Sequence, residues 1–420
     1  MDIASRLSHL EWPFFEDSHR ALGDAISAWS HRLTKGPFDE IGNIDLTCRN
    51  IVRELGEAGW LKYASAGRAF GAQHDGLEVR SISLIRENLA YAHELADFAF
   101  AMQGLGSAPI ALFGNERQKA RYLPGVIRGS LIPAFALSEP EAGSDAAALA
   151  TEARPEGGFY VLNGLKTWVS NGGLADFYVV FARLPGTQGS KGICALIVEA
   201  ETPGLEIVER IHVTAPHPLA TIAFRGCAVP REQLIGGEGE GFKIAMKTLD
   251  AFRISVAAAA VGFARRALDE SLDRVTKRKV FGLTLAELQL TQSKLAHMAS
   301  LIDAAALLTY RAAWMKDCGK RTTKEAAMAK WFATEAAQRV VDEAVQLWGG
   351  LGVRRGYVVE TLYRAVRPLR IYEGTSEIQQ LIIAREILKA FLSSSDGRLS
   401  GQAEGREAER RKNDDGVHRP

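Results

Sequence analysis

Apolar and polar positions divide the chain into three stretches of different periodicity. From residue 1 to about 130, apolar residues recur every third or fourth position, as in Thr47 to Ala58 and Arg80 to Leu95. Such spacing places the apolar side chains on one face of an amphipathic helix. We therefore expect an all-helical first region, in which a capped helix that begins near Asn115 stops at Pro124.

The pattern changes between about 131 and 235, where short β-branched and aromatic runs alternate with Gly, Asn and Pro. Examples are Phe177 to Phe181 and Ile193 to Val198. The dipeptide Asn163-Gly164 between two apolar runs predicts a hairpin turn. This region is expected to form an antiparallel barrel or sandwich.

Helical spacing returns after the glycine-rich stretch 236–241 and holds to about residue 392. Leu249, Phe252, Val256, Ala260 and Phe263 lie on one helical stripe. Long helices with apolar stripes stabilise one another, so a helical bundle is expected. We thus divide the chain at 1–130, 131–235 and 236–392. The polar stretch 393–420 has almost no large apolar residues and is expected to be disordered.

Composition excludes several classes of protein. The 420 residues are 47% hydrophobic, and 51 basic against 50 acidic residues give a formal net charge of +1. No overall field therefore favours nucleic acid or an anionic membrane. The cysteines are far apart and the histidines lack metal-ligand spacing, so neither a zinc site nor a disulfide framework is expected. No apolar run approaches the roughly 20 residues of a membrane span, and no signal peptide is recognised, so a cytoplasmic protein is expected.

Three stretches carry candidate chemistry, and a fourth is set aside. At 370–379, Glu373 stands before Gly374, and Thr375 is placed to cap the helix that follows. Taken alone, Glu373 is either a carboxylate aimed into a cleft or a charge that favours a helix N-terminus. In the second stretch, 135–145, an apolar strand runs into a Pro/Gly turn. The third stretch, 166–173, places Trp168 and Ser170 two residues apart on an expected strand, and therefore on one face of the sheet. The G-x-G at 104–106 lacks a preceding strand and a third glycine, which argues against a dinucleotide loop.

Several motifs together resemble the acyl-CoA dehydrogenase family of FAD-dependent enzymes. They are ALSEPEAGSD at 136–145, LNGLKTWVSNGG at 162–173, LDAFR at 249–253, RKVFG at 278–282, QLWGGLGV at 346–353 and IYEGTSEIQ at 371–379. The resemblance runs from roughly residue 80 to 390. It implies an α+β multidomain fold: an N-terminal α-helical domain, a middle antiparallel β-domain and a C-terminal four-helix bundle.

The resemblance also implies a reaction. Glu373 matches the base that removes the α-proton of an acyl-CoA thioester while a hydride leaves the β-carbon for flavin N5. The product is a trans-2,3-enoyl-CoA, and electrons pass to an electron-transferring flavoprotein. Two alternatives stay open: an acyl-CoA oxidase or flavin monooxygenase-like enzyme of the same fold, and a non-catalytic helical scaffold.

Further site residues follow from the match, position by position. The FAD-binding positions are Phe135, Leu137, Ser138, Trp168, Ser170, Arg278, Phe281, Gln289, Gln346, Gly350, Thr375 and Glu377. Of these, Arg278, Phe281 and Gln289 match residues that reach the FAD of a neighbouring subunit, which implies a homotetramer or homodimer. Substrate-binding positions are Ser144, Asp250, Arg253 and Gly374. No metal is expected.

The chain departs from the family pattern at a few positions. Glu141 replaces a usual glycine, Ala365 replaces an aspartate, and Val358 stands where proline is common. Phe252 occupies a position where a few relatives place an alternative base, so Glu373 is expected to act alone. The first 80 residues match no pattern, and the acyl group stays open.

Overall fold

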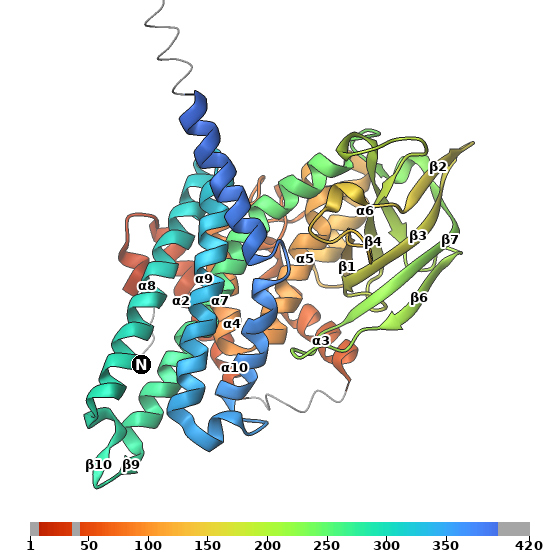
Figure 1. Ribbon diagram of the computed structural model, residues 1–420. Coiled ribbons are helices and arrows are strands. Elements are labelled where there is room, and N and C mark those ends of the chain that lie inside the picture. Colours follow the sequence, from red (N-terminus) through yellow and green to blue (C-terminus); the bar gives the residue numbers. More distant parts are fainter. Residues whose placement is uncertain (1–7, 36–42, 394–420) are drawn as a thin grey trace, which may run out of the picture.

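The computed structural model describes residues 8–35 and 43–393, and these form a helical body with a β-sheet unit on one side (Figure 1). The N-terminal helices are α2 (Asp17–Ser30), α3 (Ile44–Glu57), α4 (Val79–Ala92), α5 (Glu94–Phe113) and α6 (Glu116–Ile127). The expected helical first region is confirmed. The tail expected to be disordered lies outside the described residues from 394 onward.

Two local details of this region differ from expectation. Helix α6 begins at a capping box between Asn115 and Gln118, but it continues past Pro124 to Ile127. A proline removes one backbone donor without obliging the chain to leave the helix at once. Helix α5 is long and apolar enough to cross a membrane by composition, contrary to expectation, but 78% of its apolar window is buried inside the protein.

The middle region forms one eight-stranded sheet. Its strands are β1 (Pro133–Ala136), β2 (Glu152–Glu156), β3 (Phe159–Ser170), β4 (Phe177–Arg183), β5 (Ile193–Glu199), β6 (Leu205–Arg210), β7 (Leu219–Pro230) and β8 (Leu234–Ile235). The order is β6-β7-β3-β2-β4-β5-β8, with β1 beside β4. Pairing is antiparallel except for β1 with β4 and one residue pair between β2 and β4.

The expected hairpin at Asn163-Gly164 is wrong, because β3 runs straight through both residues. Strand β7 pairs with β3 on either side of them, and the register shifts between Leu162 and Asn163. The glycine is used for a close approach: a Cβ at Gly164 would lie 2.7 Å from the Cα of Thr151. At this register shift Gly226 of β7 has no partner on β3, so the bulge lies in β7, opposite the residue pair that favours a tight turn.

The C-terminal region is a bundle of long helices. It contains α7 (Gly241–Lys277), α8 (Gln289–Asp317), α9 (Thr323–Trp348), the short α10 (Val358–Val366) and a helix at 376–393. A two-stranded hairpin, β9 (Lys279–Val280) and β10 (Leu283–Thr284), connects α7 to α8 at one end of the bundle (Figure 1). We propose domain divisions at 131 and 236, which lie in the loops that flank the sheet.

The Ala-rich part of α7 is buried within one chain. Ala257 to Ala260 are fully buried in a core shared by α4, α7, α8 and α9. Gly262 continues this close approach, because a Cβ there would lie 2.1 Å from the backbone oxygen of Glu87 on α4. Small side chains thus allow α4 to pack directly on α7.

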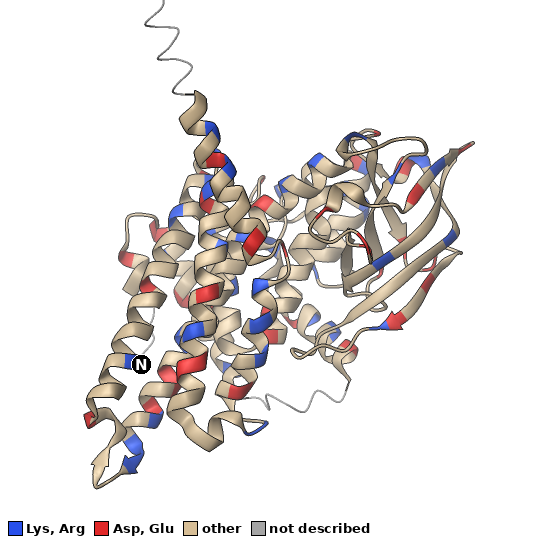
Figure 2. Cartoon of the chain, viewed as in Figure 1, with Lys and Arg blue, Asp and Glu red and all other residues tan. Residues whose placement is uncertain are grey.

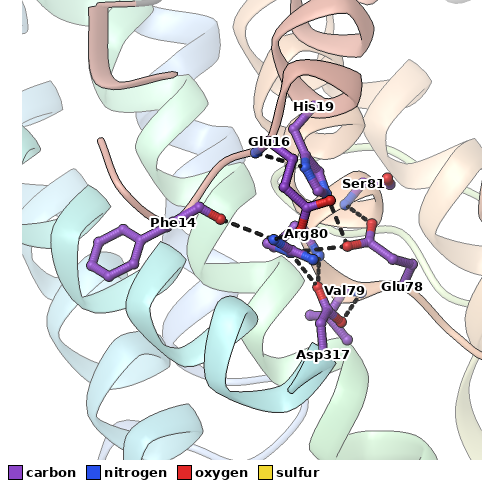
Figure 3. A network of polar contacts seen from close by, with 8 residues as sticks. All are labelled: Phe14, Glu16, His19, Glu78, Val79, Arg80, Ser81 and Asp317. Atoms are coloured by element: carbon purple, nitrogen blue, oxygen red, sulfur yellow. Dashed lines mark hydrogen bonds and ion pairs between the residues drawn. The ribbon is translucent and has the colours of Figure 1, made fainter. Parts of the chain in front are cut away.

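A polar network joins the N-terminal segment to the bundle (Figure 3). The Arg80 guanidinium contacts the Phe14 carbonyl and the carboxylates of Glu16, Glu78 and Asp317. Asp317 also accepts the backbone N–H groups of Val79 and Arg80. The network therefore fixes the start of α4 against the end of α8.

Charged residues of both signs are interspersed along the described chain (Figure 2). This distribution agrees with the near-zero net charge. The four cysteines are free, and the described residues contain no group of His, Cys, Asp and Glu suited to hold a metal.

Candidate active site

Glu373 lies in a turn between a 3-10 helix (Arg367–Arg370) and the helix at 376–393. Its φ is +52°, in the left-handed region, and Gly374 follows with φ +91°. The Thr375 Oγ1 accepts the backbone N–H of Ile378 at 3.4 Å, so Thr375 caps the helix as expected. A non-glycine residue with positive φ costs on the order of 1 to 3 kcal/mol and is found where neighbouring contacts hold it.

Three side chains hold this turn by its carbonyl groups. The Glu373 carbonyl accepts from Arg253 Nε at 3.3 Å and from Gln379 Nε2 at 3.2 Å. The Gly374 carbonyl accepts from Lys330 Nζ at 2.7 Å and from Gln379 Nε2 at 3.0 Å. The donors come from α7, α9 and the last helix, so the bundle itself fixes the backbone of Glu373.

The Glu373 carboxylate is placed in a site that disfavours its charge. Part of the residue reaches the surface, but Oε2 is buried and has no hydrogen-bond partner among the described residues. Burial raises the pKa of Glu373, while the charges of Arg86, Arg253 and Lys330 oppose the rise. An unpartnered buried carboxylate of raised pKa is suited to accept a proton.

Close to this turn lies a buried ion pair between Arg86 on α4 and Asp97 on α5, and both charges affect the pKa of Glu373. Arg86 Nε and a terminal nitrogen donate to the two Asp97 oxygens at 2.8 and 2.9 Å, and its other terminal nitrogen donates to Ser255 Oγ at 3.0 Å. The two side chains are 3% and 5% exposed. Neither residue was predicted as part of the site.

A second group of predicted residues gathers at the end of β1. Phe135 packs on Phe181 with ring centroids 4.8 Å apart. The Leu137 carbonyl accepts from Lys166 Nζ at 3.0 Å, and the Ser138 carbonyl accepts the Thr167 N–H at 3.0 Å. In a trans peptide the N–H points opposite to the C=O, so the Ser138 N–H points away from Lys166.

Lys166 and Glu139 form a buried ion pair that holds the segment after β1 in place. Lys166 is fully buried and donates to Glu139 at 2.6 Å. Glu139 also accepts the N–H groups of Ala150 and Thr151. Burial lowers the pKa of Lys166 to about 8, against the opposing effect of Glu139.

Trp168 lies beside this segment in a second irregularity of β3. The register with β7 shifts between Lys166 and Val169, and Trp168 has φ +56°. Trp168 is 60% exposed, whereas Val169 is buried and Ser170 is half-buried. The bulge therefore presents a large aromatic surface next to the outward N–H of Ser138.

The predicted substrate-binding residues lie in two places. Arg253 donates to Asp250 at 2.9 Å, so these two predicted residues form an ion pair. The same Arg253 is only 7% exposed and contacts Glu373, which joins it to the candidate site. Ser144 is exposed on the turn that follows Glu139.

Five of the remaining predicted residues lie at the far end of the bundle, whereas Glu377 is on the helix at 376–393. Arg278 is the C-cap of α7, Phe281 is at the tip of the β9–β10 hairpin, and Gln289 begins α8 (Figure 1). Gln346 and Gly350 lie where α9 ends, near α7, because Trp348 Nε1 donates to the Glu270 carbonyl at 3.2 Å. Phe281 is 98% exposed and has φ +53°. Within one chain, this group is separate from the β1 segment.

Sequence reasoning missed Lys330, Arg86, Asp97 and Gln379. Lys330 shares a helical stripe with Ala326, Ala333 and Ala337, all of which are buried. A charged residue at a core position of an amphipathic helix is rare unless it is paired. The position of Lys330 among alanines on one helical stripe was therefore the feature of the sequence that could have identified it.

Comparisons with known proteins cover nearly the whole described chain. Three family models match: the acyl-CoA dehydrogenase N-terminal domain at residues 17–130, the middle domain at 134–227 and the C-terminal domain at 239–388. The match therefore begins well before residue 80, where the expected resemblance started.

Two curated relatives are similar over most of their length. A 3-(aryl)acrylate reductase of Clostridium sporogenes is 37% identical over 90% of this chain and 100% of its own. The mitochondrial short-chain specific acyl-CoA dehydrogenase of Mus musculus is 40% identical over 81% of this chain and 83% of its own.

Two solved structures agree with the fold. One comes from work on the electron transferring flavoprotein of Acidaminococcus fermentans, with TM-score 0.84 and 36% identity over 89% of this chain and 98% of that chain. The other is an acyl-CoA dehydrogenase complexed with FAD from Bacillus anthracis, with TM-score 0.83 and 30% identity over 94% of this chain and 70% of that chain.

Proposed function

Since this chain belongs to the acyl-CoA dehydrogenase family of FAD-binding oxidoreductases, we propose that it oxidises an acyl-CoA thioester to the trans-2,3-enoyl-CoA, with Glu373 as the base. One observation carries the proposal. A carboxylate oxygen with no hydrogen-bond partner among the described residues is buried on a left-handed turn that three side chains hold in place.

The residues at the end of β1 fit a flavin ring. Trp168 offers an exposed aromatic face, and the outward Ser138 N–H offers a donor at its edge. Phe135, Leu137 and Ser170 complete this wall. When bound there, FAD supplies the acceptor for the hydride that leaves the β-carbon.

Glu373 supplies the proton acceptor. An aqueous glutamate has a pKa near 4.3 and is a weak base for a C–H bond. Burial raises the pKa of Glu373, and a bound acyl chain removes further water from it. The Glu373 N–H, on the same residue, is available to donate to the thioester oxygen, which stabilises the charge that develops as the α-proton leaves.

The CoA arm lies along Arg253, Asp250 and Ser144, with Gly374 against the thioester. Glycine is required at 374 because φ is +91° and a Cβ would lie 2.5 Å from Gln379 Nε2. Arg253 joins the two functions, since it pairs with Asp250 and also holds the Glu373 carbonyl.

Three of the far-end residues act on a neighbouring subunit. Arg278, Phe281 and Gln289 bind the FAD of a second copy, with Arg278 on the diphosphate. The positions along the ribityl and adenine side of the cofactor are Gln346, Gly350, Thr375 and Glu377. The assembly is a homotetramer or homodimer. The enzyme acts in the cytoplasm and passes its electrons to an electron-transferring flavoprotein.

The test is an anaerobic titration of the purified FAD-loaded protein with straight, branched, cyclic and aryl acyl-CoAs. Bleaching of the flavin by one of them is expected, with the enoyl-CoA as product. Absence of bleaching across the panel contradicts the proposal. Admission of air separates an oxidase, since rapid reoxidation with peroxide identifies oxygen as the acceptor.

A second arm addresses the reductive direction, because the Clostridium sporogenes relative is a 3-(aryl)acrylate reductase. The dithionite-reduced protein is mixed with a 3-arylacrylate and, separately, with its CoA thioester. Reoxidation by the free acid assigns the chain to that activity. Reoxidation by the thioester alone supports the acyl-CoA enzyme.

A further inference from the structure

Lys330 is a buried cation directed at the turn that carries Glu373. Its side chain is fully buried on α9, and Nζ donates to the Gly374 carbonyl at 2.7 Å. No other hydrogen bond of this ammonium group is found among the described residues. A buried ammonium group is costly, and a neutral donor would satisfy a carbonyl equally well.

The positive charge of Lys330 interacts with the charged groups around it. Glu373 is the largest favourable partner of the Lys330 charge, and Arg253 is an opposing neighbour. Burial lowers the pKa of Lys330 to about 8, and the negative charge of Glu373 limits that fall. The attraction is mutual, since Lys330 also opposes the rise in the pKa of Glu373.

Other charged groups face the same turn from every packed element. They are Arg86 on α4, Asp97 on α5, Arg253 on α7 with its partner Asp250, Glu335 on α9, and Tyr372 and Glu377 in the last segment. Two of the three cations near Glu373 have a closer carboxylate partner: Arg86 pairs with Asp97, and Arg253 with Asp250. Lys330 instead contacts the backbone of the turn.

We propose that Lys330 is a positioning residue for Glu373: its hydrogen bond to Gly374 holds the turn, and its charge keeps the buried carboxylate ionised and ready to accept a proton. The inference rests on the proposed function of Glu373 as the base. It assigns to α9 a part in the reaction beyond packing.

The experiment compares Lys330→Met, Lys330→Gln and Lys330→Arg with the wild-type FAD-loaded enzyme. Lys324→Met is the control, because Lys324 lies on the same helix with its side chain 41% exposed. The rate of flavin reduction by a saturating acyl-CoA is measured against pH. Loss of a nearby positive charge raises the pKa of a carboxylate, so the acid limb should move to higher pH.

The expected shift is about one pH unit or more in the Met and Gln variants, or about tenfold slower reduction at a pH below the limb. The Arg and control variants should keep the wild-type limb. Two uncharged variants are used so that a failure of one to fold leaves the other. An acid limb at the wild-type pH in a folded uncharged variant overturns the proposal, because a purely structural lysine lowers the rate equally at all pH values.

A second measurement does not depend on catalysis. Amide hydrogen exchange of the peptide covering 372–380 should be faster in Lys330→Met than in Lys324→Met, since the turn loses a donor. If no acyl-CoA reduces the wild-type flavin, the proposed function fails. The amide hydrogen exchange of this peptide still tests whether Lys330 holds the turn. Unchanged exchange then overturns the role of Lys330, and faster exchange supports it.

Discussion

At the scale of single residues, the backbone conformation of Glu373 and the burial of its carboxylate both cost free energy. Glu373 has a positive φ, a buried oxygen without a partner among the described residues, and a raised pKa. Strain and desolvation of this kind are found at positions selected for chemistry. Two predictions follow from this one side chain.

The first concerns catalysis by Glu373→Gln. The amide keeps the shape of the side chain but cannot accept the α-proton, so flavin reduction by acyl-CoA should fall by about 10² to 10⁴. FAD content and acyl-CoA binding, followed by the flavin spectrum, should persist. A variant that still reduces its flavin at the wild-type rate would place the base at another residue.

The second concerns the stability of the same variant. Because burial raises the pKa of Glu373 in the folded state, the wild type loses stability as pH rises from the ordinary glutamate pKa through the folded value. Glutamine does not titrate. Glu373→Gln should therefore melt at a higher temperature than the wild type near pH 8, with a smaller difference near pH 4.5.

Scanning calorimetry at both pH values checks this second expectation. Glu57→Gln serves as a control, because Glu57 is 69% exposed and should change the melting temperature little at either pH. Equal melting temperatures of Glu373→Gln and wild type at pH 8 would mean that the carboxylate is well solvated in the folded protein.

Site residues that belong to a short contiguous motif could be predicted from the sequence, and residues that reach the site only through the fold could not. Glu373, Gly374 and Thr375 are adjacent in sequence, and Arg253 lies in a motif of its own. Lys330, Arg86 and Gln379 contribute only through the folded bundle, which brings α4, α9 and the last helix to one turn. A single charged position on an apolar helix face indicates a partner, but it does not say which one.

At the scale of elements, the same division between local and tertiary information holds. Periodicity predicted the helices, the strands and the bundle, because burial imposes its spacing directly on the chain. It failed at Asn163-Gly164, where pairing with β7 holds β3 in one continuous strand, and at Pro124, which α6 passes. Both failures involve residues with more than one structural use.

The crossing of α4 and α7 gives a prediction for Gly262→Ala. Alanine favours a helix, but its Cβ would lie 2.1 Å from the Glu87 carbonyl oxygen and 3.1 Å from the Ala90 Cβ. The helices must separate, so a destabilisation of about 1 to 3 kcal/mol is expected in urea unfolding. Gly158→Ala is the control, since nothing lies within 4 Å of its added Cβ.

The polar network of Figure 3 gives a prediction for Arg80→Met. Removing the guanidinium leaves the Glu78 and Asp317 carboxylates buried without their shared cation, at a cost of about 3 to 5 kcal/mol. Near pH 5 the carboxylates take up protons more readily, so the loss should be smaller than at pH 8.

The matched control for Arg80→Met is Arg20→Met. Arg20 pairs with Asp17, whose side chain is fully exposed, so its removal should cost at most about 1 kcal/mol at both pH values. Urea unfolding measures both variants. A cost for Arg80→Met that matches the control would mean that the network contributes no more than a surface pair.

At the scale of the whole molecule, the predicted site residues of one chain lie in separate places. Some are on the turn of Glu373 and at the end of β1, and others lie near the β9–β10 hairpin at one end of the bundle (Figure 1). Phe281, 98% exposed at the hairpin tip, is an apolar side chain without cover in the single chain. We propose that two copies related by a two-fold axis complete both sites at once.

Mixing two defective chains tests this arrangement. Arg278→Ala should lose FAD on gel filtration, whereas Lys277→Ala, at an exposed neighbouring position, should retain it. Glu373→Gln and Arg278→Ala are then co-expressed with different tags, and the hybrid is isolated by both. If sites are shared, the chain with intact Glu373 takes its arginine from the partner, and one site of each hybrid pair reduces its flavin. If each site is built from one chain, every site in the hybrid carries a defect, and activity stays at the level of the inactive parents.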